Sequence, residues 1–514
     1  MNGAESLVHT LLASGVDTCF ANPGTSEMHF VAALDRIQGM RCVLGLFEGV
    51  VTGAADGYAR MADKPAATLL HCGPGLANGL ANLHNARRAR SPVVNCVGDQ
   101  ATQHRPLDAP LTADTEGFAR AVSAWVRTAR AAASVGADAA AAAQAARTSP
   151  GQIATLILPS DTCWTDGGVV AAPLPVPKPP LVAPHLIEQA AALLRRERGV
   201  LLMLGHGALR EKPLADANRI AVATGARLIA QQSNPRIQRG RGRVPVARVP
   251  YVVEEALAAL AGVRHAILVG AADPVAFFGY PGKPGRMLPA DAVVHLLARP
   301  EQDLPAALAA LADALDAPAV AVPSSAPVGE PARGRVTSEA FGQSLAALLP
   351  EAAVVVDESI SFARGVFAQT YAAAPHDWLA LTGGAIGSGL PMATGAAVAA
   401  PGRRVVSLQA DGSAMYTLQS LWTQARERLD VTTIILANRK YAILLGELAN
   451  VGAGNPGRTA LDMMDLERPV LDWVQLAAGM GVEAARAEDM EQFNDLFAAS
   501  LRRSGPFVIE LLIP

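Results

Sequence analysis

The chain has 514 residues, of which 51% are apolar and 17% are charged. This composition excludes an intrinsically disordered chain, and at roughly 150 residues per domain the length predicts about three domains. Lys and Arg number 43 and Asp and Glu number 46, a formal net charge of −3, so the chain lacks the basic excess that nucleic-acid binding usually requires.

The chain has five cysteines: Cys19, Cys42, Cys72, Cys96 and Cys163. Their number is odd and no two form a CxxC pair, which argues against a disulfide framework or a zinc site and favours a reducing compartment.

The first 17 residues lack a basic region followed by an apolar run, so we expect no signal peptide. The apolar stretch 385–400 is broken by Gly387, Gly389 and Pro391 and is too short to span a bilayer. We therefore expect a cytoplasmic protein that binds no membrane.

Two Pro-rich stretches, 171–184 and 317–335, are predicted linkers. They divide the chain into predicted domains at 1–170, 185–316 and 336–514. Each domain alternates short Val/Ile/Leu runs with helical patterns, which predicts α/β domains with doubly wound parallel sheets.

The predicted strands are buried apolar runs. They are 67–72, 92–98 and 153–159 in the first domain, 199–205 and 265–270 in the second, and 353–358, 404–412, 431–438 and 507–513 in the third. The Ala-rich segment 131–147 predicts a helix.

The first polar motif is NPGTSE, residues 22–27, which follows the strand-like TCFA. Its composition predicts a turn that presents Thr25 and Ser26 at the C-terminal end of a strand. Alone, the motif is equally compatible with a helix cap.

The second motif is Glu48, which begins a helix of small residues at 49–60. A carboxylate there is either a helix N-terminal acid or a buried group that transfers protons. From the residues alone, the simpler role as a helix acid is favoured.

The third motif is His71, which ends the predicted strand 67–72 and precedes a predicted glycine loop, GPGLANG. The spacing is GxGxxxG with Pro74 inside it, so the loop does not match a dinucleotide fingerprint. His104, beside Gln103 and Asp108, lies on a predicted loop after strand 92–98. Binding and catalytic residues are often found on loops at strand ends.

The fourth motif lies in the third domain, where two consecutive predicted strands end in polar residues. Asp411, Gly412 and Ser413 follow one strand and Asn438 follows the other. Ligands of parallel sheets bind beyond the C-terminal strand ends, and carboxylate and amide oxygens suit Mg²⁺ shared with a phosphate. The alternative is that Asp411 and Ser413 only cap a helix.

Taken together, these motifs resemble the thiamine-diphosphate-dependent 2-oxo-acid decarboxylases and carboligases, a superfamily that includes acetolactate synthase, benzoylformate decarboxylase and pyruvate decarboxylase. The resemblance covers essentially the whole chain and implies pyrimidine-binding, middle and diphosphate-binding domains in that order. The family's cofactor motif begins Gly-Asp-Gly and ends in Asn; here it runs from Ala410 to Asn438. Ala410 and Ala437 depart from the family pattern, but neither position supplies a side-chain metal ligand there.

The resemblance implies thiamine diphosphate and Mg²⁺ as cofactors. It assigns Mg²⁺ to the side chains of Asp411 and Asn438 and to the Lys440 carbonyl. The residues assigned to thiamine diphosphate are Gly412, Ser413, Ser361, Gly384, Ile386, Tyr441 and Glu48. In the family, the counterpart of Ile386 holds the cofactor bent, and the counterpart of Glu48 protonates its pyrimidine nitrogen.

The resemblance also implies catalytic roles for Glu48, His71, Thr25 and His104. His71 matches a catalytic histidine of benzoylformate decarboxylase, and Thr25 replaces a substrate-binding serine. That enzyme's second active-site histidine has no clear counterpart in 271–285, where Phe277 or Phe278 occupies the region. The run GPGLANGLANLHNARRARSPVV is also similar to acetolactate synthase large subunits.

We therefore expect decarboxylation of a small-molecule 2-oxo acid, with aldehyde release or carboligation, by a homodimer or homotetramer whose active sites lie between subunits. The alternatives are an acetolactate synthase, an FAD-linked oxidase and a non-catalytic relative. No convincing FAD pattern occurs at 205–208, and the intact Glu48, Asp411 and Asn438 argue against a non-catalytic scaffold.

Overall fold

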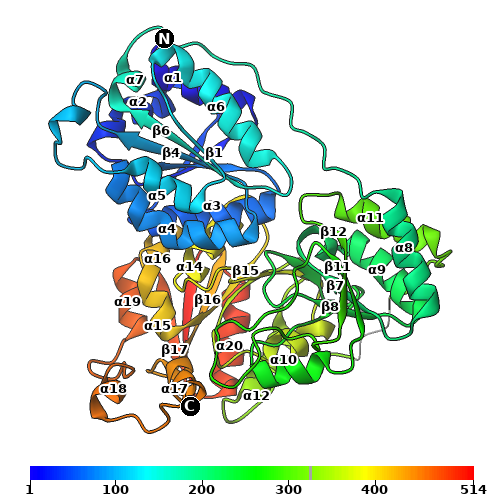
Figure 1. Ribbon diagram of the computed structural model, residues 1–514. Coiled ribbons are helices and arrows are strands. Elements are labelled where there is room, and N and C mark those ends of the chain that lie inside the picture. Colours follow the sequence, from blue (N-terminus) through cyan, green and yellow to red (C-terminus); the bar gives the residue numbers. More distant parts are fainter. Residues whose placement is uncertain (323–326) are drawn as a thin grey trace.

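The computed structural model describes residues 1–322 and 327–514. Within them the strands form three sheets that, apart from one strand of the third sheet, follow one another along the chain, with helices packed around each (Figure 1). The predicted fold class, α/β with three doubly wound parallel-sheet units, is confirmed. Residues 171–183 carry no helix or strand, as expected of a linker. The second predicted linker includes residues 323–326, which lie outside the described residues.

The first sheet is parallel throughout. Its order is β2 (Arg41–Leu44), β1 (Thr18–Ala21), β3 (Ala66–Leu70), β4 (Val93–Asp99), β6 (Ile153–Pro159) and β5 (Trp125–Thr128). Its helices are α1 (Gly3–Ala13), α2 (Met28–Arg36), α3 (Glu48–Ala62), α4 (Cys72–Ala89), α5 (Thr115–Val122), α6 (Ala132–Arg147) and α7 (Ser160–Trp164). Helices α1 and α6 share one core with the sheet, and α3, α4 and α5 share the other.

The second sheet is also parallel, as expected for strands that alternate with helices. Its order is β10 (Ala247–Arg248), β8 (Arg227–Ala230), β7 (Leu201–Leu204), β11 (His265–Val269) and β12 (Val293–Ala298). Its helices are α8 (Pro184–Arg196), α9 (Glu211–Thr224), α10 (Val253–Leu260) and α11 (Leu304–Ala314).

The third sheet carries the polar strand ends of the fourth motif. Its order is β17 (Glu483–Ala487), β18 (Phe507–Leu512), β16 (Val431–Ala437), β15 (Val405–Ala410), β13 (Val354–Glu358), β14 (His376–Ala380) and β9 (Ile237–Arg239). Its helices are α12 (Ser338–Leu348), α13 (Val366–Gln369), α14 (Gly389–Ala399), α15 (Asp411–Ala414), α16 (Ser420–Arg426), α17 (Ala442–Asn450), α18 (Arg458–Asp462), α19 (Trp473–Gly479) and α20 (Met490–Leu501).

Strand β9 comes from the predicted middle domain but pairs antiparallel with β14 at the edge of the third sheet. The predicted boundaries 1–170, 185–316 and 336–514 stay a prediction, and β9 shows that the second range reaches into the third sheet.

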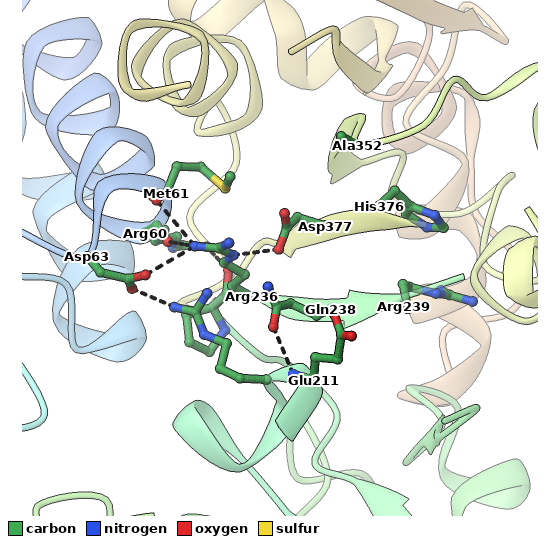
Figure 2. Close-up of polar contacts among 12 residues, drawn as sticks. Arg60, Met61, Asp63, Glu211, Arg236, Gln238, Arg239, Ala352, His376 and Asp377 are labelled. Atoms are coloured by element: carbon green, nitrogen blue, oxygen red, sulfur yellow. Dashed lines mark hydrogen bonds and ion pairs between the residues drawn. The ribbon is translucent and has the colours of Figure 1, made fainter. Parts of the chain in front are cut away.

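A buried ion-pair network joins the three parts of the chain next to β9 (Figure 2). Arg236 donates to Asp377 Oδ1 on β14 over 2.5 Å and to the Arg60 carbonyl of α3 over 3.1 Å. Burial alone would raise the pKa of Asp377, but Arg236 and Arg403 lower it overall. Since an unpaired charge at this depth would be costly, the network holds the three sheets in one arrangement.

Helices α3 and α14 pack closely enough to bring their backbones into contact. A Cβ on Gly57 would overlap the Met392 carbonyl, and one on Gly395 would overlap the Ala54 carbonyl. The small residues of α3 therefore serve close helix packing, which places the first sheet against the third (Figure 1). Among the described residues, no helix combines the length and apolar character needed to cross a bilayer.

Candidate functional site

Asp411 lies at the C-terminal end of β15, beside the end of β16. The two strands pair in parallel with Ala410 opposite Leu436, so Asp411 and Asn438 follow neighbouring strand ends, as predicted. Asp411 is buried, and its two carboxylate oxygens accept backbone N–H groups of Gly412 over 2.9 Å and Arg439 over 2.6 Å. Burial raises the pKa of Asp411 although these N–H groups lower it. A cation would stabilise this buried carboxylate.

The other residues of this motif form a tight polar turn around the same strand ends. Asn438 Oδ1 accepts the Lys440 N–H over 3.1 Å, and Ser413 Oγ donates to the Ala410 carbonyl over 3.1 Å. A Cβ on Gly412 would lie 2.5 Å from Tyr441 Cε1. Only glycine allows the Tyr441 ring to lie so close to the start of α15.

A cavity of about 710 Å³ lies between the third sheet and the second. Of the residues assigned to the cofactor, Gly384, Ile386 and Tyr441 line it. Its apolar and aromatic lining includes Tyr251, Phe277, Phe278, Phe367, Tyr416 and Leu444. Ser361 lines an adjoining pocket of about 150 Å³ that shares Tyr251 and Arg364 with the cavity. Among the described residues, those that line the cavity all belong to 232–463.

Glu358, which the sequence analysis did not single out, also lines this cavity. It ends β13, and its carboxylate accepts the backbone N–H groups of Gly387 over 2.6 Å, Gly389 over 2.5 Å and Ser388 over 3.3 Å. Burial raises the pKa of Glu358 to about 7 although these N–H groups lower it. The signal in the sequence that could have identified Glu358 is its place at the end of a buried strand, because ligands of parallel sheets bind there.

Glu48 is the first residue of α3, as predicted, and is buried. Its Oε2 accepts a hydrogen bond from Asn78 Nδ2 over 3.0 Å. A Cβ on Gly75 would lie 2.8 Å from Glu48 Oε1. The glycines after His71 are therefore packing positions in the first turns of α4, and the predicted glycine loop is wrong: β3 ends at Leu70 and α4 begins at Cys72.

His71 lies at the N-terminus of α4, where it contacts the turn formed by NPGTSE. Its Nδ1 is 2.8 Å from Glu27 Oε2 and 3.3 Å from Ser26 Oγ. Thr25 and His104 are exposed, His104 on the loop before a 3-10 turn. Glu27 was missed by the sequence analysis, although it stands in the quoted motif, because nothing local pairs it with a histidine 44 residues away.

Two family models match the chain. One describes the N-terminal thiamine pyrophosphate (TPP) binding domain of thiamine pyrophosphate enzymes and matches residues 1–120; the other describes their C-terminal TPP binding domain and matches residues 363–511. The chain is 52% identical, over 100% of its length and 99% of the relative, to a putative acetolactate synthase large subunit, IlvX, of Mycobacterium tuberculosis. It is 29% identical to the benzoylformate decarboxylase of Pseudomonas aeruginosa, over 97% of this chain and 96% of that one.

The fold is also similar to solved structures. The thiamine diphosphate-dependent 4-hydroxybenzoylformate decarboxylase of Rhodococcus jostii matches with a TM-score of 0.84 and 24% identity, over 99% of this chain and 98% of that one. A putative thiamin diphosphate-dependent enzyme of Mycobacterium smegmatis matches over 100% of both chains, also with a TM-score of 0.84 and 24% identity.

Proposed function

Because the chain belongs to the thiamine pyrophosphate enzyme family and is a thiamine-diphosphate-dependent enzyme of the acetolactate synthase and benzoylformate decarboxylase type, we propose that it decarboxylates a 2-oxo acid with the help of Mg²⁺. The remaining fragment is released as an aldehyde or joined to a second carbonyl. The observation that carries this proposal is buried Asp411 at paired strand ends, next to Gly412, against which packs Tyr441, a residue that lines the cavity together with Gly384 and Ile386.

The residues present fit the two cofactors. Asp411, Asn438 and the Lys440 carbonyl would hold Mg²⁺, since oxygen ligands suit this ion and the buried Asp411 carboxylate needs a positive partner. Gly412 and Ser413 follow Asp411 in the first turn of α15, and their backbone N–H groups and the Ser413 hydroxyl would turn from their present partners to bind a diphosphate. When bound, thiamine diphosphate stabilises the carbanion that the loss of CO₂ leaves behind.

We propose that Glu48 holds and moves a proton at the pyrimidine ring of the cofactor. It is 6% exposed, so bulk water cannot replace it in this role. Asn78 holds one carboxylate oxygen, which orients the other. His71, whose Nδ1 contacts Glu27 Oε2, is the group proposed to give a proton to the product.

The residues proposed for the site lie in two parts of the chain. Glu48 and His71 lie in the part that the N-terminal family model matches, whereas the cavity is lined by residues from 232–463. We propose a homodimer, itself able to pair into a tetramer, in which the first sheet of one subunit completes the cavity of the other. This arrangement supports active sites at subunit interfaces.

The lining of the cavity favours a 2-oxo acid larger than pyruvate. Phe277 and Phe278 pack edge to face with ring centres 4.9 Å apart, and Tyr251 lies 5.4 Å from Phe277. A screen of aliphatic and aromatic 2-oxo acids, with CO₂ release followed with and without added aldehyde, tests the proposal. The name of the 52% identical relative makes acetolactate synthase the second candidate. Acetolactate formed from pyruvate alone would favour that candidate, and no CO₂ from any 2-oxo acid would refute both.

His71→Ala is expected to lower aldehyde release more than carboligation. Aldehyde release needs a proton donor at the reacting carbon, whereas carboligation captures the same carbanion with a carbonyl, and general acid steps typically contribute ~10²–10⁴-fold. The measurement is the ratio of aldehyde to hydroxyketone formed from one accepted 2-oxo acid. His9→Ala, which changes an exposed histidine on α1, is the control and should keep the wild-type ratio. If both rates fall together in His71→Ala, His71 is not the selective donor.

A further inference from the structure

Three side chains with different metal-binding chemistry meet at the N-terminus of α4. Glu27, His71 and Cys72 each offer one ligand atom, and these atoms all lie within 4.8 Å of one another. His71 Nδ1 is 2.8 Å from Glu27 Oε2, and Cys72 Sγ is 4.0 Å from Glu27 Oε1. Ser26 Oγ lies 3.1 Å from Cys72 Sγ, on the same side of the cluster.

The fold builds this cluster from two neighbouring strand ends. Strands β1 and β3 pair in parallel, so the turn after β1 brings Glu27 next to His71 and Cys72, which follow β3. The Gly24 N–H donates to Glu27 Oε2 over 2.8 Å and holds the carboxylate in place. A Cβ on Gly98 would overlap Glu27 Oε1, and one on Gly24 would overlap the His71 ring. Two glycines thus leave room for these side chains.

Cys72 is held in the cluster by its backbone. Its φ of +53° lies in the left-handed region, which a cysteine adopts only where the surroundings impose it. The side chain is 1% exposed, and burial raises the pKa of its thiol although the Ser26 hydroxyl lowers it. His71 is 24% exposed and gives the cluster its access to solvent.

One carboxylate, one imidazole and one thiolate form the ligand set of an open zinc site. Zn–ligand bonds of about 2.0–2.3 Å in a tetrahedron put ligand atoms about 3.3–3.7 Å apart. Two of the three distances, 2.8 Å and 4.0 Å, lie on either side of this range, and the third is no more than 4.8 Å. Side-chain shifts of about 1 Å therefore suffice to bring the ligand atoms into the range. The Ser26 hydroxyl or a water molecule can fill the fourth position. The charges of the thiolate and the carboxylate together balance a divalent cation.

We propose that Glu27, His71 and Cys72 bind a thiophilic divalent cation such as Zn²⁺, at a site separate from the oxygen-lined Mg²⁺ site. On binding, the thiol gives up its proton to solvent, and the His71 ring binds the metal through a nitrogen that carries no proton. Sulfur and nitrogen ligands select against Mg²⁺, so Mg²⁺ does not compete with the thiophilic cation for this site.

Occupancy of this site would inhibit the enzyme reversibly. A metal that holds the His71 ring takes it away from the substrate, so His71 cannot serve the metal and the product at the same time. The effect on turnover rests on the proposed function, whereas metal binding itself does not.

Cobalt is a suitable probe because a thiolate bound to Co²⁺ gives a charge-transfer band that Mg²⁺ buffers and free carboxylates do not produce. We expect the full chain, in excess Mg²⁺ and a non-chelating reductant, to develop this band with one equivalent of Co²⁺ and to lose it on addition of Zn²⁺. Cys72→Ser should lose the band and bind Co²⁺ at least about ten-fold more weakly.

The matched control is Cys42→Ser, which removes the exposed thiol of β2 and should keep the band. X-ray absorption at the cobalt edge of the wild-type protein, which needs no variant, should show one sulfur ligand and one imidazole. A wild-type protein without the band, or a Cys72→Ser protein that keeps it, would overturn the proposal. Both readouts are independent of substrate, so they cannot be confused with failure of the proposed function.

Discussion

Replacing Asp411 by alanine is expected to leave the fold intact and to remove almost all affinity for thiamine diphosphate and Mg²⁺. The carboxylate is 3% exposed at the paired ends of β15 and β16, and among the described residues its hydrogen-bond partners are backbone N–H groups. Losing one partner of a buried ion pair costs about 3–5 kcal/mol, or roughly 10²–10⁴-fold in Kd.

Calorimetry with thiamine diphosphate and Mg²⁺ measures this effect, and circular dichroism checks the fold. Asp462→Ala is the matched control: it removes a half-exposed carboxylate on α18 and should bind like the wild type. Wild-type affinity in Asp411→Ala would show that Asp411 only caps α15 and would remove the proposed metal site.

Glu48→Gln is expected to bind the cofactor normally and to lose most turnover. The amide keeps the size of the side chain, and its oxygen can still accept the hydrogen bond from Asn78 Nδ2. It cannot give a proton to the cofactor as a carboxylic acid does, and such steps typically contribute ~10²–10⁴-fold.

Hydrogen–deuterium exchange at thiazolium carbon 2 of bound cofactor, followed by quenched NMR, should slow by a similar factor. Glu116→Gln, a change of a half-exposed glutamate on α5, should exchange at the wild-type rate. Unchanged exchange in Glu48→Gln would show that Glu48 is only the N-terminal acid of α3.

The same two variants test whether the site lies between subunits. If Glu48 of one copy serves the Asp411 site of another, a mixed dimer of Glu48→Gln and Asp411→Ala has one intact site. Random assembly after dissociation should then restore about a quarter of wild-type activity. If both residues served one site within one chain, the mixture would stay inactive.

The local pattern of the sequence was enough to predict the fold class and much of the candidate site. Runs of Val, Ile and Leu alternating with helical patterns predicted the parallel sheets, because the periodicity of a strand or a helix involves residues that are close together in the sequence. Asp411 and Asn438 could be placed together because consecutive strands joined by a helix pair in parallel and end at the same edge. The functional roles of both residues stay predictions.

Tertiary structure alone decided what surrounds these residues. The glycines after His71 read as a loop by composition, yet they lie in α4, where Glu48 leaves no room for a Cβ on Gly75. In the same way, the small residues of α3 serve its contact with α14, a helix more than 300 positions away.

The partners of His71 were likewise beyond the reach of local patterns. Ser26 and Glu27 approach it because β1 and β3 are neighbours in the first sheet. Strand β9 joins the third sheet from the middle of the chain. Turn chemistry and periodicity act over a few residues. The contacts of His71 and of β9 depend instead on which apolar surfaces are buried against each other when the whole chain packs. The sequence by itself therefore determined which groups stand at the strand ends, and only packing decided which of them meet.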